Sequence, residues 1–476
     1  MRHALPLAAF LSGLLLLAGC GGAGGAEKVD PPTAGAGGAA SPANAGGAFA
    51  KEGWFGGADG LHARVQIKGV ERQGTKSVLR YSVTSLDSSA KSVRFAIGLL
   101  DPVGRLLYRP TGSTSGDGFA PGATREMAAE YPAIPASVEK VTVLTPGTAG
   151  EFTGVPVTGT GDASAASSAR LRGNPADLYD ITEGEIKDVA SSGSRVTVNL
   201  HTDVLFSTGS AELSGRAKTV LDEAAQEIKA KAMRPLTFEG HTDTKGGDAD
   251  NLKLSKERAE AVLKEMKTRL GDGFTYTARG MGEAEPVAQE GGADDATARA
   301  RNRRVEISYQ VKRPSEGSAS PSTSPSGAAA PAGFRPDDGK TVASRYGRFG
   351  EAKRRLDVKP FYRDGAYIVA VFDIVNEGPG TTPPDAAYVH KDYPGGVFTS
   401  FSIQVPGDKT VYRAVRIGPG TPGSSGAYVD PGRAVFRTGL NQPVRGFVYV
   451  PAPSGDITSV VFDGGPFGKV NKVPVS

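Results

Sequence analysis

Two oppositely charged side chains, Asp243 and Arg258, lie close together in the sequence of this 476-residue chain. An arginine guanidinium can hold a carboxylate with two parallel hydrogen bonds, and an aspartate can hold an ammonium group. The pair therefore suits a zwitterion that carries both charged groups on one carbon atom. The alternative interpretation is a salt bridge within the domain, which contributes little by itself.

Strand and helix patterns place Asp243 on a loop. Residues 195–200 alternate between apolar and polar types, which predicts a strand. Apolar residues then recur at three- and four-residue spacing between 213 and 228, which predicts a helix capped by Ser210. A second strand is predicted at 236–240, so Asp243 follows a strand end, where sheet-plus-helix folds place ligand sites.

A second helix is predicted to be capped by Ser255 and to end at Gly271. This places Arg258 in the first helical turn, where free backbone N–H groups would also favour a bound anion. Strands predicted at 274–278 and 304–309 complete the order strand, helix, strand, helix, strand, strand. That order predicts an α+β domain with a mixed sheet and helices on one face.

Several short motifs follow one another through this region. They are Gly240-His241-Thr242-Asp243, Asn251, Leu254-Ser255-Lys256-Glu257-Arg258-Ala259, Gly280-Met281-Gly282-Glu283 with Pro286, Arg299, and Asn302-Arg303-Arg304-Val305-Glu306. The ordered set resembles the OmpA-like C-terminal family, the peptidoglycan-binding domain also found in peptidoglycan-associated lipoproteins and flagellar stator proteins. The resemblance covers about a quarter of the chain.

The resemblance implies a non-catalytic domain that binds diaminopimelate in the peptide stems of peptidoglycan. It implies that Asp243 takes the ammonium group of this residue and that Arg258 takes the carboxylate. The residues expected to support the pocket are Thr242, Asn251, Leu254, Asn302 and Arg303. For Asn302 and Arg303 the alternative role is packing at the sheet edge. His241 is expected to be a structural hydrogen-bonding residue rather than a catalyst.

Two positions depart from the family pattern. Many family members carry an acidic residue in the loop after the first strand, and here that loop reads Phe206-Ser207-Thr208-Gly209. One ammonium contact is therefore expected to be missing. Ala298 stands where the family usually has glycine before Arg299, which affects only the expected local backbone geometry.

The N-terminus predicts an exported lipoprotein. Arg2 and His3 precede an apolar stretch at 5–17 that is too short for an ordinary membrane span. Leu17-Ala18-Gly19-Cys20 resembles a bacterial lipobox, in which the cysteine receives a diacylglyceryl group and palmitate and anchors the chain to a membrane. Cys20 is the only cysteine, so the mature chain can form no internal disulfide. The alternative is a plain secretory signal with an incidental cysteine.

Stretches rich in Gly, Pro, Ser and Ala divide the mature chain into three folded pieces. The predicted organisation is a signal peptide at 1–19, a flexible tether at 20–53, a β-sandwich-like domain at 54–158, a linker and lead-in at 159–194, the OmpA-like domain at 195–311, a Pro/Ser/Ala linker at 312–339, and a second β-sandwich-like domain at 340–476. The two outer domains are assigned from short alternating runs separated by turns. The formal net charge of +4 gives no electrostatic reason to expect a nucleic-acid partner.

The expected function is to tether a membrane to the cell wall within the cell envelope, without breaking covalent bonds. One alternative is an envelope scaffold whose β-sandwich-like domains recruit a protein partner. A second is a secreted metal-dependent hydrolase built around His241, Asp243, Asp248 and Asp250. Only five histidines and no cysteine cluster are available as ligands, so we expect no metal and no other cofactor.

Overall fold

The computed structural model describes residues 49–56, 60–112, 116–292, 294–311, 329–380, 386–420, 425–432 and 439–476. The predicted signal peptide, the lipidation residue Cys20 and most of the predicted tether lie outside these ranges, as do residues 312–328 of the second linker. Lipidation at Cys20 therefore stays a prediction.

The N-terminal region ends at Gly161, and its regular elements are strands. They are β1 (Phe49–Phe55), β2 (Leu61–Gly74), β3 (Lys76–Ser85), β4 (Lys91–Val93), β5 (Gly98–Asp101), β6 (Leu106–Tyr108), β7 (Asp117–Phe119), β8 (Thr124–Pro132), β9 (Lys140–Leu144) and β10 (Glu151–Gly161). β1, β2, β3 and β8 pair antiparallel in that order. β10 lies parallel to β2 and connects through β9 and β5 to β6.

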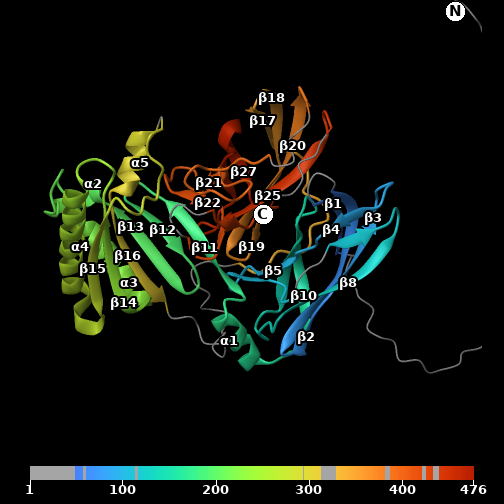
Figure 1. Cartoon of the computed structure of the whole chain (residues 1–476), viewed down its shortest axis with the longest axis horizontal. Coiled ribbons are helices and arrows are strands. Elements are labelled where there is room, and N and C mark those ends of the chain that lie inside the picture. The colour runs from blue at the N-terminus through green and yellow to red at the C-terminus, as the bar shows by residue number, and fades with distance from the viewer. Residues whose placement is uncertain are drawn as a thin grey trace, which may run out of the picture. The chain divides into compact units, whose positions relative to one another are not determined.

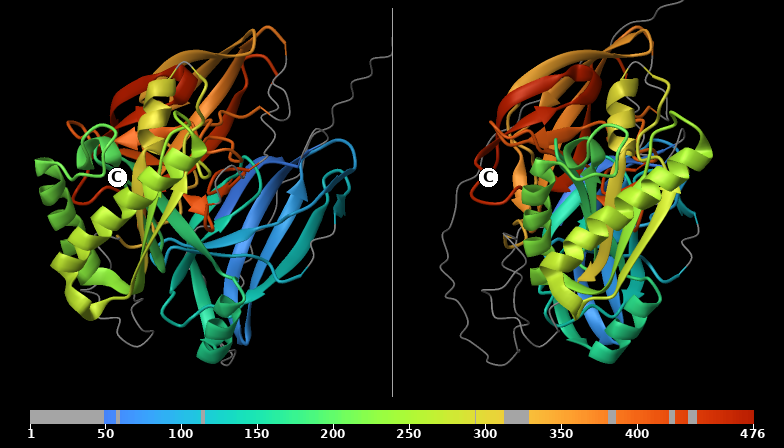
Figure 2. Two further views of the ribbon diagram at one scale, coloured as in Figure 1. Left: turned by 60° about the vertical axis from the view of Figure 1, so that its left-hand side comes forward. Right: turned by 90° about the vertical axis from the view of Figure 1, so that its left-hand side faces the viewer.

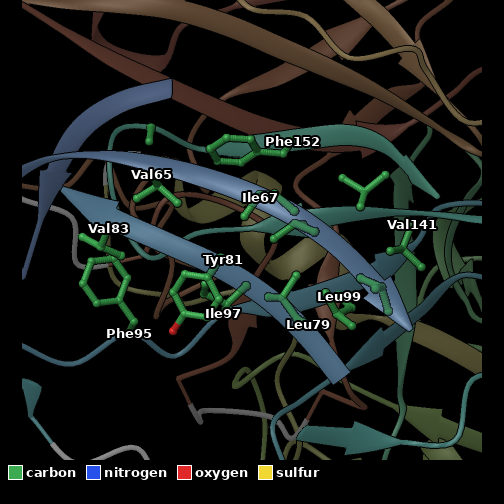
Figure 3. Close-up of a cluster of buried hydrophobic side chains, with 14 of the residues drawn as sticks. Val65, Ile67, Leu79, Tyr81, Val83, Phe95, Ile97, Leu99, Val141 and Phe152 are labelled. Carbon is green, nitrogen blue, oxygen red and sulfur yellow. The ribbon is translucent and has the colours of Figure 1, made fainter. Parts of the chain in front are cut away.

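Alternate side chains of these strands form a shared apolar core. Figure 3 shows Val65 and Ile67 of β2 clustered with Leu79 and Tyr81 of β3 and with Phe152 of β10. Burial alternates along β2 because successive side chains of a strand point to opposite faces. The predicted strand-rich character is confirmed, whereas the assignment to the sandwich class stays a prediction.

The C-terminal region is also rich in strands. They are β17 (Ala343–Phe349), β18 (Ala352–Val358), β19 (Tyr362–Asp364), β20 (Tyr367–Gly378), β21 (Ser402–Gln404), β22 (Val411–Arg413), β23 (Arg416–Ile417), β24 (Ala427–Tyr428), β25 (Pro443–Pro451), β26 (Ser459–Asp463) and β27 (Lys469–Pro474), with a 3-10 turn η2 (Gly465–Phe467). One sheet runs β17, β18, β20, β25, and a second run of pairs joins β22, β21, β26 and β27. β20 is almost entirely buried, as its continuous apolar run predicts.

The segment predicted as a linker and lead-in contains regular structure. Its elements are α1 (Ala163–Leu171), β11 (Ala176–Glu183) and β12 (Lys187–Ser191). β11 pairs with β6 of the N-terminal region, with β22 and β23 of the C-terminal region, and with β12. Residues Ala48–Ser476 form one compact unit, and the predicted domain boundaries within it stay a prediction.

The central region holds the predicted site. Its elements are β13 (Arg195–His201), α2 (Thr202–Leu205), α3 (Gly215–Lys231), β14 (Ala232–His241), α4 (Asp248–Leu270), a 3-10 turn η1 (Gly271–Gly273), β15 (Tyr276–Gly282), α5 (Asp295–Asn302) and β16 (Arg304–Val311). The sheet runs β12, β13, β16, β14, β15, and only the β14–β15 pair is parallel. The predicted mixed sheet is thus confirmed.

Helices α3 and α4 supply one side of the central core (Figure 1). The long yellow-green α4 packs against β14 and β15 and contacts α3 (Figure 2). The buried face of α3 is Ala217, Val220, Leu221, Ala224, Ala225 and Ile228. These are six of the seven positions predicted from helical spacing, and the seventh, Leu213, is only partly buried against the core.

The predicted helix starts are wrong. Ser214, not Ser210, caps α3, and its hydroxyl accepts a hydrogen bond from the amide of Ala217 at 3.1 Å. Helix α4 follows Gly247, so Ser255 lies inside the helix and Arg258 comes ten residues after its first residue. Ser255 resembles a cap in the sequence, but its hydroxyl instead accepts a hydrogen bond from the amide of Gly282 at 3.0 Å. The helix N-terminus therefore cannot assist Arg258 in the predicted way.

The end of α4 and the third predicted strand can also be compared. Gly271 ends α4 with φ of 73°, which confirms the prediction and suits glycine. The strand predicted at 274–278 begins later, as β15. Within the described part of the chain, no helix is long and apolar enough to cross a bilayer.

Candidate functional site

A pocket of about 240 Å³ opens beside Arg258 in the central region. Its walls come from α2, from the loop after it, from α4 and from the residue that follows α5. The lining residues are Thr202, Asp203, Phe206, Ser207, Thr208, Gly209, Arg258 and Arg303. Two of the predicted site residues, Arg258 and Arg303, are thus brought together, and the other lining residues come from the segment after the first strand of the domain.

Arg258 presents an incompletely bonded cation to this pocket. Only 5% of the residue is exposed, and its Nε donates a hydrogen bond to the carbonyl of Ser210 at 3.0 Å. Its guanidinium lies 5.4 Å from the ring centre of Phe206. Among the residues that the structure describes, its two terminal nitrogens have no hydrogen-bond partner and form no ion pair. Burial lowers the pKa of Arg258, while the nearby Asp203 raises it.

Arg303 joins two carboxylates beside the pocket. Its Nη1 donates to Oδ2 of Asp243 at 2.6 Å, and its Nε and Nη2 donate to the two oxygens of Asp203 at 3.0 and 2.5 Å. The bidentate hydrogen bonds lower the pKa of Asp203 and raise that of Arg303. Arg303 is therefore a positioning residue for both acids, which goes beyond the predicted supporting role.

The two acids differ in accessibility. The side chain of Asp203 is 51% exposed and lines the pocket. Asp243 is 7% exposed and does not line the pocket, but it bonds to Arg303, which does. Asp203 is not among the predicted site residues, because the acidic residue that many family members carry after the first strand was expected to be missing here. The carboxylate lies in the one-turn helix α2, before the loop at Phe206, so the pocket has an acidic lining residue although that loop carries none. The expectation that one ammonium contact is missing stays a prediction.

Thr242, Asn251 and Leu254 lie on the loop and helix that follow β14. The Thr242 amide donates to the carbonyl of Gly282 at 2.8 Å, and the buried Thr242 hydroxyl has no hydrogen-bond partner in the part of the chain that the structure describes. Asn251 is buried, and its amide donates to Glu283 at 2.8 Å and to the Asp243 carbonyl at 3.4 Å. Leu254 is half-buried on α4. Thr242 and Asn251 thus hold the Asp243 loop, and none of the three lines the pocket.

Asn302 is fully buried and organises the segment before α5. Its Oδ1 accepts from the amides of Val287 and Ala288 at 2.9 and 3.0 Å. Its Nδ2 donates to the Ala288 carbonyl at 2.9 Å and to Glu290 at 2.7 Å. Asn302 therefore fixes the loop that leads into α5, and Arg303 follows directly after this helix.

Close packing against α4 requires the glycine of the Gly240-His241-Thr242-Asp243 motif. A Cβ at Gly240 would lie 1.9 Å from the carbonyl oxygen of Ser255, so any side chain would push α4 away from β14. Gly280 on β15 approaches the same helix, where its Cβ would lie 2.6 Å from the carbonyl oxygen of Leu252. This close packing brings Arg258 of α4 near the end of β14.

His241 differs from the expectation of a structural hydrogen-bonding residue. It is 1% exposed, and within the described ranges neither ring nitrogen has a hydrogen-bond partner. Burial lowers the pKa of His241 to about 2, with a further contribution from Arg304. Among the described residues, no three His, Cys, Asp or Glu side chains are grouped so as to hold a metal ion.

Comparison with known proteins bears on this region. Residues 205–303 match the model of the OmpA family. This segment is an OmpA family domain. The matched residues start inside α2 and end at Arg303, so they contain Asp243 and Arg258 but not Asp203.

Relatives of the OmpA family domain include envelope proteins. "Probable lipoprotein YiaD" of Escherichia coli is 30% identical over 145 residues, which is 29% of this chain and 65% of that protein. "Outer membrane porin F" of Pseudomonas aeruginosa is 36% identical over 118 residues, which is 24% of this chain and 32% of that protein. The match thus spans less than two thirds of either relative.

Solved structures give similar partial matches. The "peptidoglycan-associated lipoprotein from Burkholderia pseudomallei" is 28% identical, with a TM-score of 0.19, over 23% of this chain and 86% of that one. The "cell wall anchor of the T6SS from Pseudomonas aeruginosa" is 30% identical, with a TM-score of 0.24, over 26% and 88% of the two chains.

Proposed function

We propose that the OmpA family domain binds the zwitterionic end of diaminopimelate in peptidoglycan stem peptides. The observation that carries this proposal is the Arg258 guanidinium, which is buried at a pocket wall with both terminal nitrogens unbonded within the described chain. Buried charges in proteins are normally paired. A ligand carboxylate would supply the missing partner through two parallel hydrogen bonds.

The neighbouring acids suit the ammonium group of the same ligand. Asp203 is the carboxylate that the pocket exposes, and Asp243 is the predicted contact that shares Arg303 with it. Arg258, Arg303, Asp203 and Asp243 carry charges that sum to zero. A zwitterion adds no net charge, so the site with its ligand stays neutral in a partly desolvated pocket, which favours binding.

We extend the proposal to the whole chain as a non-catalytic tether in the cell envelope. Acyl chains on Cys20 would hold the N-terminus in a membrane while the OmpA family domain holds the wall. Two weak attachments on one chain strengthen each other through effective concentration. Similarity to proteins named as lipoproteins and as outer membrane proteins supports this placement. The strand-rich flanking regions would act as β-sandwich-like spacers or as sites for a protein partner.

Co-sedimentation with purified sacculi tests the binding proposal. We expect the full chain to sediment with the sacculi and Arg258→Ala and Asp243→Ala to remain in the supernatant. Arg269→Ala is the matched control, because Arg269 lies on the same helix and pairs with Asp222 and Glu265 away from the pocket.

The control variant should sediment like the unchanged chain. Retained sedimentation of both pocket variants would defeat the site assignment. A chain that does not sediment at all would defeat the proposed function itself.

A further inference from the structure

We propose that the C-terminal region holds the peptidoglycan pocket in its binding geometry through one buried carboxylate, Asp392. The inference rests on the proposed function and names a regulation of the same site. Asp392 belongs to the loop at 390–393, about 90 residues beyond α5 in the sequence. We call its contacts to the OmpA family domain the Asp392 clamp.

The Asp392 clamp grips two separate segments of the OmpA family domain. Oδ1 of Asp392 accepts a hydrogen bond from the amide of Gln289 at 2.9 Å, and Oδ2 accepts one from Nη1 of Arg301 at 2.9 Å. The Asp392 side chain is 4% exposed. Lys391 adds a contact at the edge, since its Nζ lies 2.7 Å from Oδ1 of Asp294.

Arg301 on α5 is the centre of this contact. Its guanidinium also meets Glu183 of β11 at 2.7 Å, Asp188 of β12 at 3.3 Å and the hydroxyl of Tyr393 at 2.8 Å. Arg413 of β22 holds the same Glu183 at 2.6 Å. Such a network is rigid when every member is bonded, and losing one member leaves its buried partners with fewer hydrogen bonds and ion pairs.

The two segments held by Asp392 lead directly to the pocket. Glu290, next to Gln289, accepts from Nδ2 of Asn302 at 2.7 Å and from the hydroxyl of Thr244 at 2.6 Å. Thr244 follows Asp243 in the chain, and Asn302 separates Arg301 from Arg303. Both partners of the Asp243–Arg303 ion pair are therefore attached, one residue away, to a network that Asp392 completes.

Two consequences follow from this connection. If the clamp orders the Asp243 loop and the end of α5, its loss must weaken ligand binding, because the ligand then has to order these segments itself. Thermodynamic linkage requires the reverse effect as well: ligand binding must strengthen the clamp by the same factor. The C-terminal region is thereby assigned a role in binding without contact to the ligand.

The test uses the full chain and measures the effect of the clamp on ligand affinity and the effect of the ligand on the clamp. The probe is a disaccharide tripeptide that ends in diaminopimelate, and calorimetry gives its affinity for the unchanged chain and for Asp392→Ala and Lys391→Ala. We expect affinity to fall about tenfold in Asp392→Ala and less in Lys391→Ala, whose side chain is partly exposed. Hydrogen exchange at 386–400 should slow when the probe is added to the unchanged chain.

Lys409→Ala is the matched control, because Lys409 forms an exposed pair with Glu185 and does not touch the loop before α5. Its affinity should equal that of the unchanged chain. Lys391→Ala keeps the test decisive if Asp392→Ala does not fold. Unchanged affinity in the clamp variants with unchanged exchange at 386–400 would overturn the coupling and leave the proposed function intact. If the unchanged chain did not bind the probe, both would fail.

Discussion

Replacing Arg258 by methionine separates a binding role from a structural role. Methionine keeps a flexible stem of similar length but removes the charge. If Arg258 stabilises the fold, its removal should lower the free energy of unfolding, because its partners are left unbonded. If Arg258 serves to bind a ligand, its removal should leave the free energy of unfolding of the ligand-free chain unchanged or raise it.

Two opposing contributions determine the free energy of unfolding of Arg258→Met. The variant loses one hydrogen bond to the Ser210 carbonyl and one cation–π contact to Phe206, each about 1 kcal/mol. It also removes a buried cation whose desolvation costs several kcal/mol and which the nearby Asp203 and Asp243 offset only in part, since neither forms an ion pair with it among the described residues. We therefore expect the free energy of unfolding of Arg258→Met to equal that of the unchanged chain or to exceed it by about 1 kcal/mol.

Binding should change in the opposite direction. Loss of a charged hydrogen-bonding partner of the ligand carboxylate should cost about 3 kcal/mol, a factor on the order of 100 in affinity. Urea unfolding followed at the helical circular dichroism band reports the OmpA family domain, because α3 and α4 are the longest described helices. A loss of 3 kcal/mol in stability together with unchanged binding to sacculi would refute this reasoning.

Three further predictions concern buried groups around the site. The pKa of His241 is about 2 in the folded chain and near 6.5 in the unfolded chain, so the unfolded state binds more protons. The free energy of unfolding should therefore fall by about 2 kcal/mol between pH 6.5 and 5. Urea titrations of His241→Gln should lack this part of the pH dependence. Asn302→Ala should lower the free energy of unfolding by about 3 kcal/mol, because buried amides and a carbonyl lose their partner; a change below 1 kcal/mol would contradict this. Gly240→Ala should lower it by about 3 kcal/mol in thermal unfolding, because its Cβ meets the backbone of α4, and an unchanged midpoint would contradict that close packing.

The periodic parts of the central region were predictable from the sequence. The apolar spacing identifies the buried face of α3 because a helix must turn one stripe toward the core. The starts of the helices were not predictable, because a serine can cap a helix or lie inside one. Ser255 lies inside α4, where its hydroxyl accepts a hydrogen bond from the amide of Gly282. Arg258 was therefore placed on the correct helix but in the wrong turn.

The parts of the site that escaped prediction lack a periodic signal. Helix α2, which carries Asp203, spans a single turn, and α5 is rich in charged residues with only Ala298 and Asn302 buried. The contact of Arg301 with Asp392 joins residues 91 positions apart. No local pattern marks such a contact, because either side chain alone reads as an ordinary surface charge.

Calorimetry with two stem peptides tests the central claim most directly. The peptides are identical except that one ends in diaminopimelate and the other in lysine, which has the side-chain ammonium but no side-chain carboxylate. The account predicts that the full chain binds the diaminopimelate peptide at least tenfold more tightly and that Arg258→Ala removes this difference. Equal affinity for the two peptides would contradict the assignment of Arg258 to the ligand carboxylate.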